Sequence, residues 1–308
     1  MPHAVAEEPG AAPRVDAELA ARLVADQFPQ WADLPLTRFE PAGSDNLVYR
    51  LGRTMTVRLP RGAWAAGQAR KEHAWLPRLA PLLPLDIPAP LGLGRPAFGY
   101  PWHWSVTRWL PGSVATPEGF ADPERTAVEL AHFLRRLHAL PPAHRLAPGP
   151  HPELAPAPLA ERYPGTREAI AKLAGVFDTT ALTEVWDAAL AAPPWTGEPV
   201  WFHGDFHTGN LLLRDGRLSA VIDFGGLGVG DPAPDLMIAY TLLTAETRRL
   251  FRAALGVDQD TWTRGLGWAL GSGLSAYLAY AEGNPRIAAA TRRQLSEVLA
   301  EHAAPTPP

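Results

Sequence analysis

The segment WFHGDFHTGNLLLRDGRLSAVIDFGG, residues 201–226, gathers polar side chains whose types and spacing could do chemistry. They are His203, Asp205, Asn210 and Asp223. Between Asn210 and Asp223, two apolar runs are joined by Asp215-Gly216. This pattern strongly predicts a β-hairpin with a two-residue turn. A hairpin turns the chain back, so Asn210 before the first strand and Asp223 after the second should meet at one end. Their oxygen atoms could bind a hard cation, and Asp205 could accept a substrate proton.

Composition limits the classes of protein that could carry such a cluster. The chain has 308 residues of which 46% are hydrophobic, enough for a sizeable core in two lobes or domains. A net charge of -4 argues against nucleic acid or an anionic membrane as the main partner. The absence of cysteine from the sequence excludes disulfides and thiolate chemistry. No signal-peptide pattern stands at the N-terminus, so we expect a cytoplasmic protein, either a monomer or a homodimer.

The first third of the chain reads as a small β-rich lobe, residues 1–108. Residues 1–15, rich in Ala, Pro and Glu, predict a loose tail, and residues 16–28 predict an amphipathic helix. A strand–turn–strand pattern follows over residues 37–61. After a helical pattern and a Pro-rich passage, residues 103–112 read as a buried strand that ends in a Pro-Gly turn. We expect the lobe boundary at that turn.

The remainder, residues 109–308, reads as a larger and mostly helical lobe that contains the hairpin. Asp122-Pro123 offers an N-cap and a first-turn proline for a helix over residues 124–140. Residues 141–165 are rich in proline and predict an ordered loop or a lid. The apolar stretch 266–280 is short and rich in small residues, which favours a buried helix over a membrane span. The fold class is therefore α+β, with no membrane segment.

The chain resembles a known family at the motifs already quoted. HGDFHTGN, followed by IDFG, looks like the catalytic loop and metal-binding segment of the aminoglycoside phosphotransferase family. Other similar stretches are PAGSDNLVYRL, VRLPR, LAHFLRRLHAL and GDPAPDL, so the resemblance covers about residues 35 to 240. It implies a two-lobed, protein-kinase-like fold. It also implies transfer of the γ-phosphoryl group of ATP or GTP to a hydroxyl of a small molecule, an antibiotic or another metabolite.

Phosphoryl transfer needs positioning and charge neutralisation more than covalent help, and the motif residues suit both needs. By resemblance, Asp205 is the catalytic carboxylate that orients the acceptor hydroxyl or takes its proton. Asn210 and Asp223 would hold Mg²⁺, which prefers oxygen ligands. Structural roles, as caps or loop braces, are expected for His203, Asp231 and Asp235.

The small lobe departs from the usual kinase pattern at one position. Protein-kinase relatives place a Lys on the third strand, paired with a helix Glu. Here Arg58 stands at that position and Glu72 is its expected partner, with a nucleotide-phosphate role for the pair. Arg keeps the charge, but its planar fork is not equivalent to an ammonium group. The phosphate loop, which lacks a full G-x-G-x-x-G, is expected at Ser44, Asp45 and Asn46, whose backbone N–H groups could reach phosphates.

The nucleotide base is expected at the strand that leads out of the small lobe. Backbone groups near Thr107, Arg108, Trp109 and Leu110 would pair with the base edge. Val57 and Ile222 would enclose the ring. Side chains cannot distinguish adenine from guanine where backbone groups make the contacts.

Three alternatives remain open from the residues. The pattern H-x-D-x-H at His203, Asp205 and His207 could indicate a metallohydrolase, although no second cluster of His and carboxylates accompanies it in the sequence. A catalytically silent nucleotide-binding pseudokinase is the other function class. The acceptor is open as well. The late aromatic residues favour a neutral or partly apolar hydroxyl compound over a polycationic aminoglycoside; they are Trp262, Trp268, Tyr277 and Tyr280.

Overall fold

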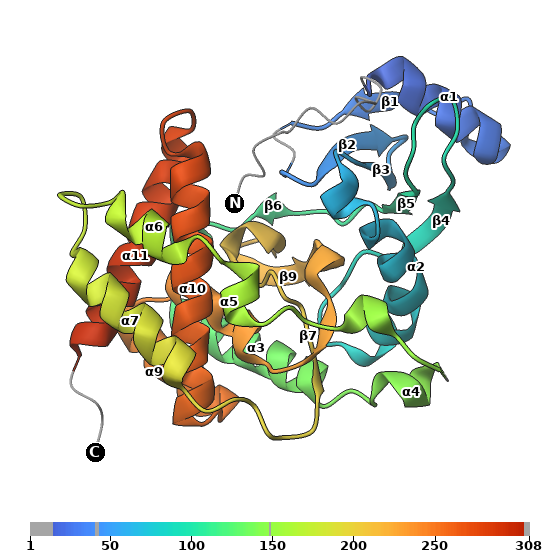
Figure 1. Cartoon of the computed structure of the whole chain (residues 1–308). Helices are drawn as coiled ribbons and strands as arrows, with labels where there is room; N and C mark the ends of the chain where they lie inside the picture. Colours follow the sequence, from blue (N-terminus) through green and yellow to red (C-terminus); the bar gives the residue numbers. More distant parts are fainter. Residues whose placement is uncertain (1–14, 41–42, 148, 305–308) are drawn as a thin grey trace.

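Five antiparallel strands form one sheet in the N-terminal part of the chain, in the order β1-β2-β3-β5-β4 (Figure 1). This computed structural model describes residues 15–40, 43–147 and 149–304. The strands are β1 (Leu36–Arg38), β2 (Asn46–Leu51), β3 (Met55–Pro60), β4 (Pro90–Gly94) and β5 (Trp104–Arg108). The expected loose tail over residues 1–15 lies almost wholly outside the described residues.

The two faces of this sheet have different partners because side chains alternate along a strand. One face packs against α1 (Ala17–Gln27) through an apolar cluster that includes Tyr49, Val57 and Val106. The opposite face carries Thr56 and Arg58, and it turns toward α2 (Gln68–Leu79). Helix α1 starts at Asp16, whose carboxylate accepts from the N–H of Leu19, so the helix predicted over residues 16–28 is confirmed.

Strand β4 lies in the Pro-rich passage where no strand was expected. It occupies one edge of the sheet and pairs with β5 alone, with an irregularity in register between Pro90 and Gly92. Proline removes a backbone donor, and an edge strand tolerates that loss because one of its sides has no ladder to complete. The high proline content of this passage therefore argued against a strand, although an edge strand such as β4 can contain proline.

Helices make up most of the remaining chain, and most of the longer ones lie on the other side of the molecule from the sheet (Figure 1). They are α3 (Pro123–His138), α4 (Ala143–Leu146), α5 (Leu159–Arg162), α6 (Thr166–Ala171), α7 (Thr179–Ala191), α8 (Ile238–Thr241), α9 (Ala245–Leu255), α10 (Gln259–Tyr280) and α11 (Pro285–Ala303). The Asp122 carboxylate caps α3 at 2.9 Å from the N–H of Arg125, as the sequence predicted. The Pro-rich stretch 141–165 holds only short helices.

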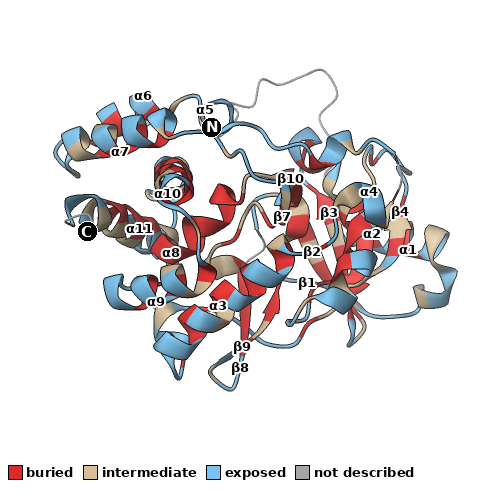
Figure 2. Cartoon of the chain, turned by 90° about the horizontal axis from the view of Figure 1, so that it is seen from below, coloured by how far each residue is buried: buried red, intermediate tan, exposed pale blue. Residues whose placement is uncertain are grey.

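Helix α10 shows why its sequence is rich in small residues. It runs through the helical part among α7, α8 and α11, with many buried positions (Figure 2). A Cβ atom at Gly265 would lie 2.6 Å from Leu236, and one at Gly267 would lie 2.4 Å from Ala189. The glycines thus admit neighbouring side chains to the helix axis, as expected for a buried helix. In the part of the chain that the structure describes, no helix is long and apolar enough to cross a membrane.

The predicted hairpin is confirmed. Strand β8 (Leu211–Arg214) pairs with β9 (Arg217–Val221), and Asp215 and Gly216 turn the chain with φ of 51° and 71°. Positive φ at both turn positions is typical of the type I′ turn that Asp-Gly favours. Strand β6 (Ser113–Val114) adds to the other edge of β8, and β7 (Val200–Phe202) pairs separately with β10 (Gly228–Gly230).

A second connection joins the hairpin to the chain segment that follows α2. Asp86, between α2 and β4, forms a parallel bridge with Ala220 of β9. Its carbonyl accepts from the N–H of Val221 at 3.0 Å. The segment that leads from α2 to β4 is therefore joined to the hairpin, in addition to the strand-to-turn passage after β5.

Candidate active site

The loop after β7 brings Asp205 against the segment that follows β9. Gly204 has φ of +80°, and a Cβ atom placed on it would lie 2.2 Å from the carbonyl oxygen of Gly226. Any side chain at position 204 would therefore collide with backbone, which explains the glycine in HGD. The contact fixes the loop at Gly204 and Asp205 against η7 (Phe224–Gly226), directly after Asp223.

A buried carboxylate holds this loop through two backbone hydrogen bonds. Asp235, in η8 (Ala233–Met237), accepts hydrogen bonds from the N–H groups of His203 at 2.9 Å and Gly204 at 2.8 Å. Its side chain is fully buried. Asp231 accepts from the Arg264 guanidinium at 2.7 Å. Both carboxylates thus make the structural contacts that were expected of them.

His203 uses both ring nitrogens inside the protein. Its Nε2 lies 3.0 Å from the carbonyl oxygen of Ile222, to which it donates, and its Nδ1 accepts from the N–H of Asp205. Burial lowers the pKa of His203, so the ring is neutral. A ring with both nitrogens engaged has no lone pair left for a metal, which counts against the metallohydrolase alternative. His203 braces the loop, as the sequence suggested.

Asp205 is half-exposed and has two partners. Asn210, at the end of η6 (Thr208–Asn210), donates its amide to the Asp205 carboxylate at 3.0 Å and to the Asp205 carbonyl at 2.8 Å. His207 Nε2 lies 3.5 Å from the same carboxylate. Burial raises the pKa of Asp205, but His207 and the hydrogen bond from Asn210 outweigh it and lower the pKa to about 2. The carboxylate is therefore ionised across the physiological range and can accept a hydrogen bond from a hydroxyl.

Arg58 joins three elements. One of its terminal nitrogens donates to both Glu72 oxygens, at 2.9 and 2.7 Å, and the other donates to Asp223 at 2.6 Å. Glu72 is the partner that the sequence predicted. Burial alone would lower the pKa of Arg58, but Glu72 and Asp223 raise it, so the guanidinium stays charged. Arg58 therefore links strand β3, helix α2 and the segment after β9.

Gln68 and Lys71 were missed by sequence reasoning, and both connect α2 to the site. Gln68 donates to Asp45 at 2.6 Å and accepts from Asn46 at 3.2 Å. Its side chain also covers η7, because a Cβ atom at Gly225 would lie 2.6 Å from it. Lys71 donates to the carbonyl of Leu227 at 2.8 Å. These long polar side chains at the start of a helix carry no local signal, because their partners lie far away in sequence.

The predicted phosphate loop lies next to these contacts. Ser44 donates to Asp45 at 3.1 Å, while Asn46 is buried at the start of β2. The Asp45 carbonyl accepts from the N–H of Arg61 at 2.8 Å, which extends the pairing of β2 with β3 at the end away from their turn. The structure thus places Ser44, Asp45 and Asn46 beside the N-terminal end of α2.

The predicted base site is brought together in part. Leu110 forms a small apolar cluster with Leu212, Ala220 and Ile222, separate from the two larger cores. The N–H groups of Arg108 and Trp109 donate to Ala89 and Thr54, so these donors are engaged inside the protein. Of the groups predicted to contact the base, the backbone of Leu110 and the buried side chain of Thr107 are left at the end of β5.

The expectation for Val57 was wrong. Val57 is fully buried in the cluster under α1, on the opposite face of β3 from Arg58. Adjacent strand residues face opposite sides, so a residue next to Arg58 cannot share its face. Thr56 is the β3 residue that pairs with Thr107 and faces the same side as Arg58.

The late aromatic residues do not form one surface. Trp262 donates to Glu301 and packs near Phe251, within the helical core. Tyr277 accepts from Arg292 and packs against Phe177. Trp268 lies apart from both, edge-on to Tyr163. These residues therefore do not form a shared binding surface, and they give no support for a partly apolar acceptor.

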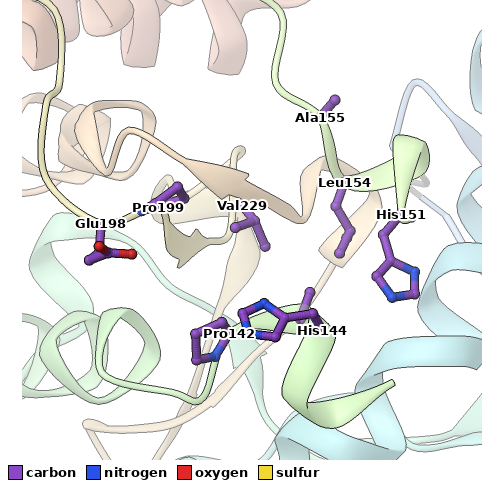
Figure 3. A pocket seen from close by; sticks show the side chains of 9 residues that line it. Pro142, His144, His151, Leu154, Ala155, Glu198, Pro199 and Val229 are labelled. Carbon is purple, nitrogen blue, oxygen red and sulfur yellow. The ribbon is translucent and has the colours of Figure 1, made fainter. Parts of the chain in front are cut away.

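A cavity of about 440 Å³ lies beside β10 and is separate from these residues (Figure 3). It is lined by the segments around His144 and Leu154, by Glu198 and Pro199, and by Val229. None of the site residues named above lines this cavity. The candidate site is therefore identified by its converging polar side chains and not by this cavity.

Comparisons with known proteins agree with this arrangement. Residues 36–268 match the model of the phosphotransferase enzyme family. An aminoglycoside 3′-phosphotransferase of Escherichia coli is 29% identical over 165 residues, which cover 50% of this chain and 59% of that protein. The chain spans less than two thirds of the length of the curated relatives reported for it.

Two solved structures show the shared fold. The GDP and kanamycin complex of an APH(2″) enzyme superposes with a TM-score of 0.70 at 21% identity, over 92% of this chain and 98% of that one. The macrolide 2′-phosphotransferase of Brachybacterium faecium gives 0.58 at 24% identity, over 94% and 99%. The family match covers residues 44–46, α2, the loop at Asp205 and the segment after β9, and the chain therefore belongs to the phosphotransferase enzyme family.

Proposed function

We propose that this protein transfers the γ-phosphoryl group of a nucleoside triphosphate to a hydroxyl of a small molecule. The observation that carries the proposal is a chain of contacts from Asp205 to Arg58. Asn210 donates to Asp205, the Asn210 backbone carbonyl accepts from the N–H of Ile222 at 2.9 Å, and the next residue, Asp223, accepts from Arg58 of the Arg58–Glu72 pair. These groups supply a hydroxyl-orienting carboxylate, oxygen ligands and a fixed positive charge. Phosphoryl transfer needs these three provisions.

Asn210 and Asp223 fit a magnesium ion. The side-chain nitrogen of Asn210 donates to Asp205. The side-chain oxygen of Asn210, Oδ1, is therefore the atom available to a metal. Asp223 is partly exposed and offers a carboxylate. Oxygen ligands of this kind suit Mg²⁺, which when bound would neutralise phosphate charge.

The nucleotide would lie between the sheet and the hairpin. Arg58, held by Glu72, would face the phosphates together with the loop at Ser44, Asp45 and Asn46. Leu110 and Ile222 would contact the base, with Thr107 at its inner end and the backbone of Arg108 and Trp109 along the rim. Relatives have been solved with GDP, ADP and ATP, and we propose that ATP or GTP is the donor here.

Asp205 would act by orientation more than by basicity. With a pKa near 2 it is a weak base, but its charge can hold the acceptor hydroxyl in line with the phosphorus atom. A proton that leaves late in a loose transition state needs no strong base. The acceptor is proposed to be a hydroxylated antibiotic or related metabolite, because the relatives are named for aminoglycosides and macrolides.

A transfer assay tests the proposal and separates it from a silent pseudokinase. Purified protein with ATP or GTP and magnesium is incubated with kanamycin, gentamicin, streptomycin and a macrolide, and products are read by mass. A mass gain of one phosphate on an acceptor supports the enzyme. Tight nucleotide binding without transfer or hydrolysis would establish the pseudokinase instead.

A further inference from the structure

The ring of His207 is fixed by the glycine two residues after it. Its Nδ1 accepts from the N–H of Gly209 at 3.0 Å, which makes His207 the N-cap of η6. A Cβ atom at Gly209 would lie 2.7 Å from Cε1 of the ring, so a side chain at position 209 would displace the ring. The glycine of the stretch HTGN, residues 207–210, therefore supplies both the N–H group and the space that hold this histidine.

The hydrogen bond from Gly209 determines which ring nitrogen of His207 can donate. A nitrogen that accepts a hydrogen bond carries no proton, so the proton of the neutral ring is on Nε2. Burial lowers the pKa of His207 and Asp205 raises it, with a net rise, but Nε2 carries a proton in the charged ring as well. Nε2 is therefore a donor in both protonation states.

Two donors converge on the same oxygen of Asp205. His207 Nε2 lies 3.5 Å from Oδ2, and the side-chain nitrogen of Asn210 lies 3.0 Å from Oδ2. Among the residues that the structure describes, none makes a hydrogen bond or an ion pair with Oδ1. The Asp205 side chain is 49% exposed. Oδ1 is therefore the carboxylate oxygen that is left for an acceptor.

We propose that His207 is a positioning residue for the transfer reaction: together with Asn210 it fixes Oδ2 of Asp205, so that Oδ1 receives the acceptor hydroxyl. The terminal torsion of an aspartate is broad, so an unrestrained carboxylate samples many orientations. Two donors on one oxygen restrict that rotation and orient the other oxygen before the acceptor arrives. His207 thus acts through Asp205 and needs no contact with the acceptor. This inference rests on the proposed transfer function.

The two histidines of the H-x-D-x-H pattern then have complementary parts. His203 accepts from the backbone N–H of Asp205 at 3.2 Å, and His207 donates toward the Asp205 carboxylate. One histidine holds the main chain of Asp205 and the other holds its side chain.

The first test needs no acceptor and reports the contact itself. Two-bond ¹H–¹⁵N correlation spectra distinguish protonated from unprotonated ring nitrogens, and of the ten histidines the signals lost in His207→Asn belong to His207. At about pH 9, well above the ordinary histidine pKa of about 6.5, His207 should be protonated at Nε2. Asp205→Asn should shift the Nε2 signal more than the Nδ1 signal, and Asp215→Asn in the hairpin turn should move neither. A ring protonated at Nδ1, or an Nε2 signal that Asp205→Asn leaves in place, would overturn the inference.

The second test uses the acceptor found in the transfer assay and separates the cap of η6 from the contact with Asp205. An Asn side chain can accept from the N–H two residues on, as Nδ1 does, but it is too short to reach Asp205. A Gln side chain places an amide N–H near the position of Nε2 and gives up the cap. His207→Asn should keep the melting temperature of wild type and lower kcat by about three- to tenfold, the effect of one hydrogen bond. His207→Gln should have a lower melting temperature and a kcat closer to that of wild type. The nucleotide KM should be unchanged in both.

The order of the two variants decides the outcome. If His207 only held the loop, kcat would follow the melting temperature, and His207→Asn would be the more active variant. That order, or equal kcat in the two variants, would overturn the inference and leave the transfer function in place. If no acceptor is phosphorylated, the transfer function itself fails and the inference fails with it.

Discussion

Arg58 and Asp223, 165 positions apart in sequence, share a hydrogen bond of 2.6 Å. Arg58 keeps Glu72 on its other terminal nitrogen at the same time. A lysine has a single terminal nitrogen, so it could not present two separate donors on a rigid plane to both carboxylates. The arginine at this position therefore ties α2 and the proposed metal ligand to β3 through one side chain.

Removing Arg58 should destabilise the protein strongly. Arg58→Ala leaves the Glu72 carboxylate buried without its partner, and breaking a buried pair in this way typically costs about 3–5 kcal/mol. Denaturant unfolding measures the loss. The double variant Arg58→Met/Glu72→Leu removes both charges and should recover most of the stability while nucleotide affinity stays low. Wild-type nucleotide affinity in the double variant would show that Arg58 is purely structural.

Asp223→Ala should abolish magnesium-dependent nucleotide binding, because the proposed ion loses its only carboxylate ligand among the residues assigned to it. Calorimetric titration of nucleotide with and without magnesium measures the difference. Asp187→Ala, at an exposed surface pair with Arg167, is the control and should bind as wild type. Magnesium-dependent binding that survives in Asp223→Ala contradicts the assignment.

Asp205→Asn should separate binding from chemistry. The amide keeps the shape and loses the charge that orients the acceptor, so kcat should fall by at least about a hundredfold, while nucleotide affinity changes little. Asp215→Asn makes the same substitution in the hairpin turn, where Asn tolerates the positive φ, and should leave kcat unchanged. Turnover of Asp205→Asn within tenfold of wild type would require another catalytic carboxylate.

The low pKa of Asp205 predicts how stability responds to acid. Its folded pKa of about 2 lies below the unfolded pKa of about 3.9. The ionised Asp205 therefore stabilises the folded state fully at a pH above the unfolded pKa, and this stabilisation is lost as the pH falls toward 2. Wild type should therefore lose stability relative to Asp205→Asn between about pH 4 and pH 2. Thermal unfolding of both proteins across this range measures it, and parallel curves would contradict the shift.

Gly204→Ala should impair the catalytic loop beyond the effect of backbone conformation. Gly175 has the same φ of +80° but open space around it, so Gly175→Ala measures the conformational cost alone, about 1–2 kcal/mol. Gly204→Ala adds a collision with Gly226 and should lower both stability and kcat further. Equal losses in the two variants would mean that the loop can move away without consequence.

Features that depend on neighbours in sequence were predictable. The Asp-Gly turn specifies the hairpin through its φ values, and Asp122 starts α3 through a local side-chain cap. The backbone hydrogen bond from Ile222 to Asn210, which brings Asp223 to the start of β8, then follows from the hairpin. The partner of Arg58 was also found, because the family pattern places a carboxylate on the next helix.

Features that depend on distant packing were not predictable. Gln68 and Lys71 look like ordinary solvent-facing helix residues, and their role appears only when η7 lies against α2. Tyr163 sits in a Pro-rich stretch without periodicity, so nothing local points to its contact with Trp268. The grouping of the late aromatic residues failed for the same reason, since helical spacing does not say which neighbour each residue meets.

The bridge between Asp86 and Ala220 adds a backbone attachment across the proposed nucleotide cleft to the side-chain contacts of Arg58 and Lys71. The chain itself also crosses in the passage after β5, where the N–H of Trp109 donates to the Thr54 carbonyl. A motion that opens the cleft and keeps the Asp86 bridge is a rotation about the line from Asp86 to Trp109, and it must break the Arg58 and Lys71 contacts. Twisting or sliding of the sheet over the hairpin would have to break the Asp86 bridge as well.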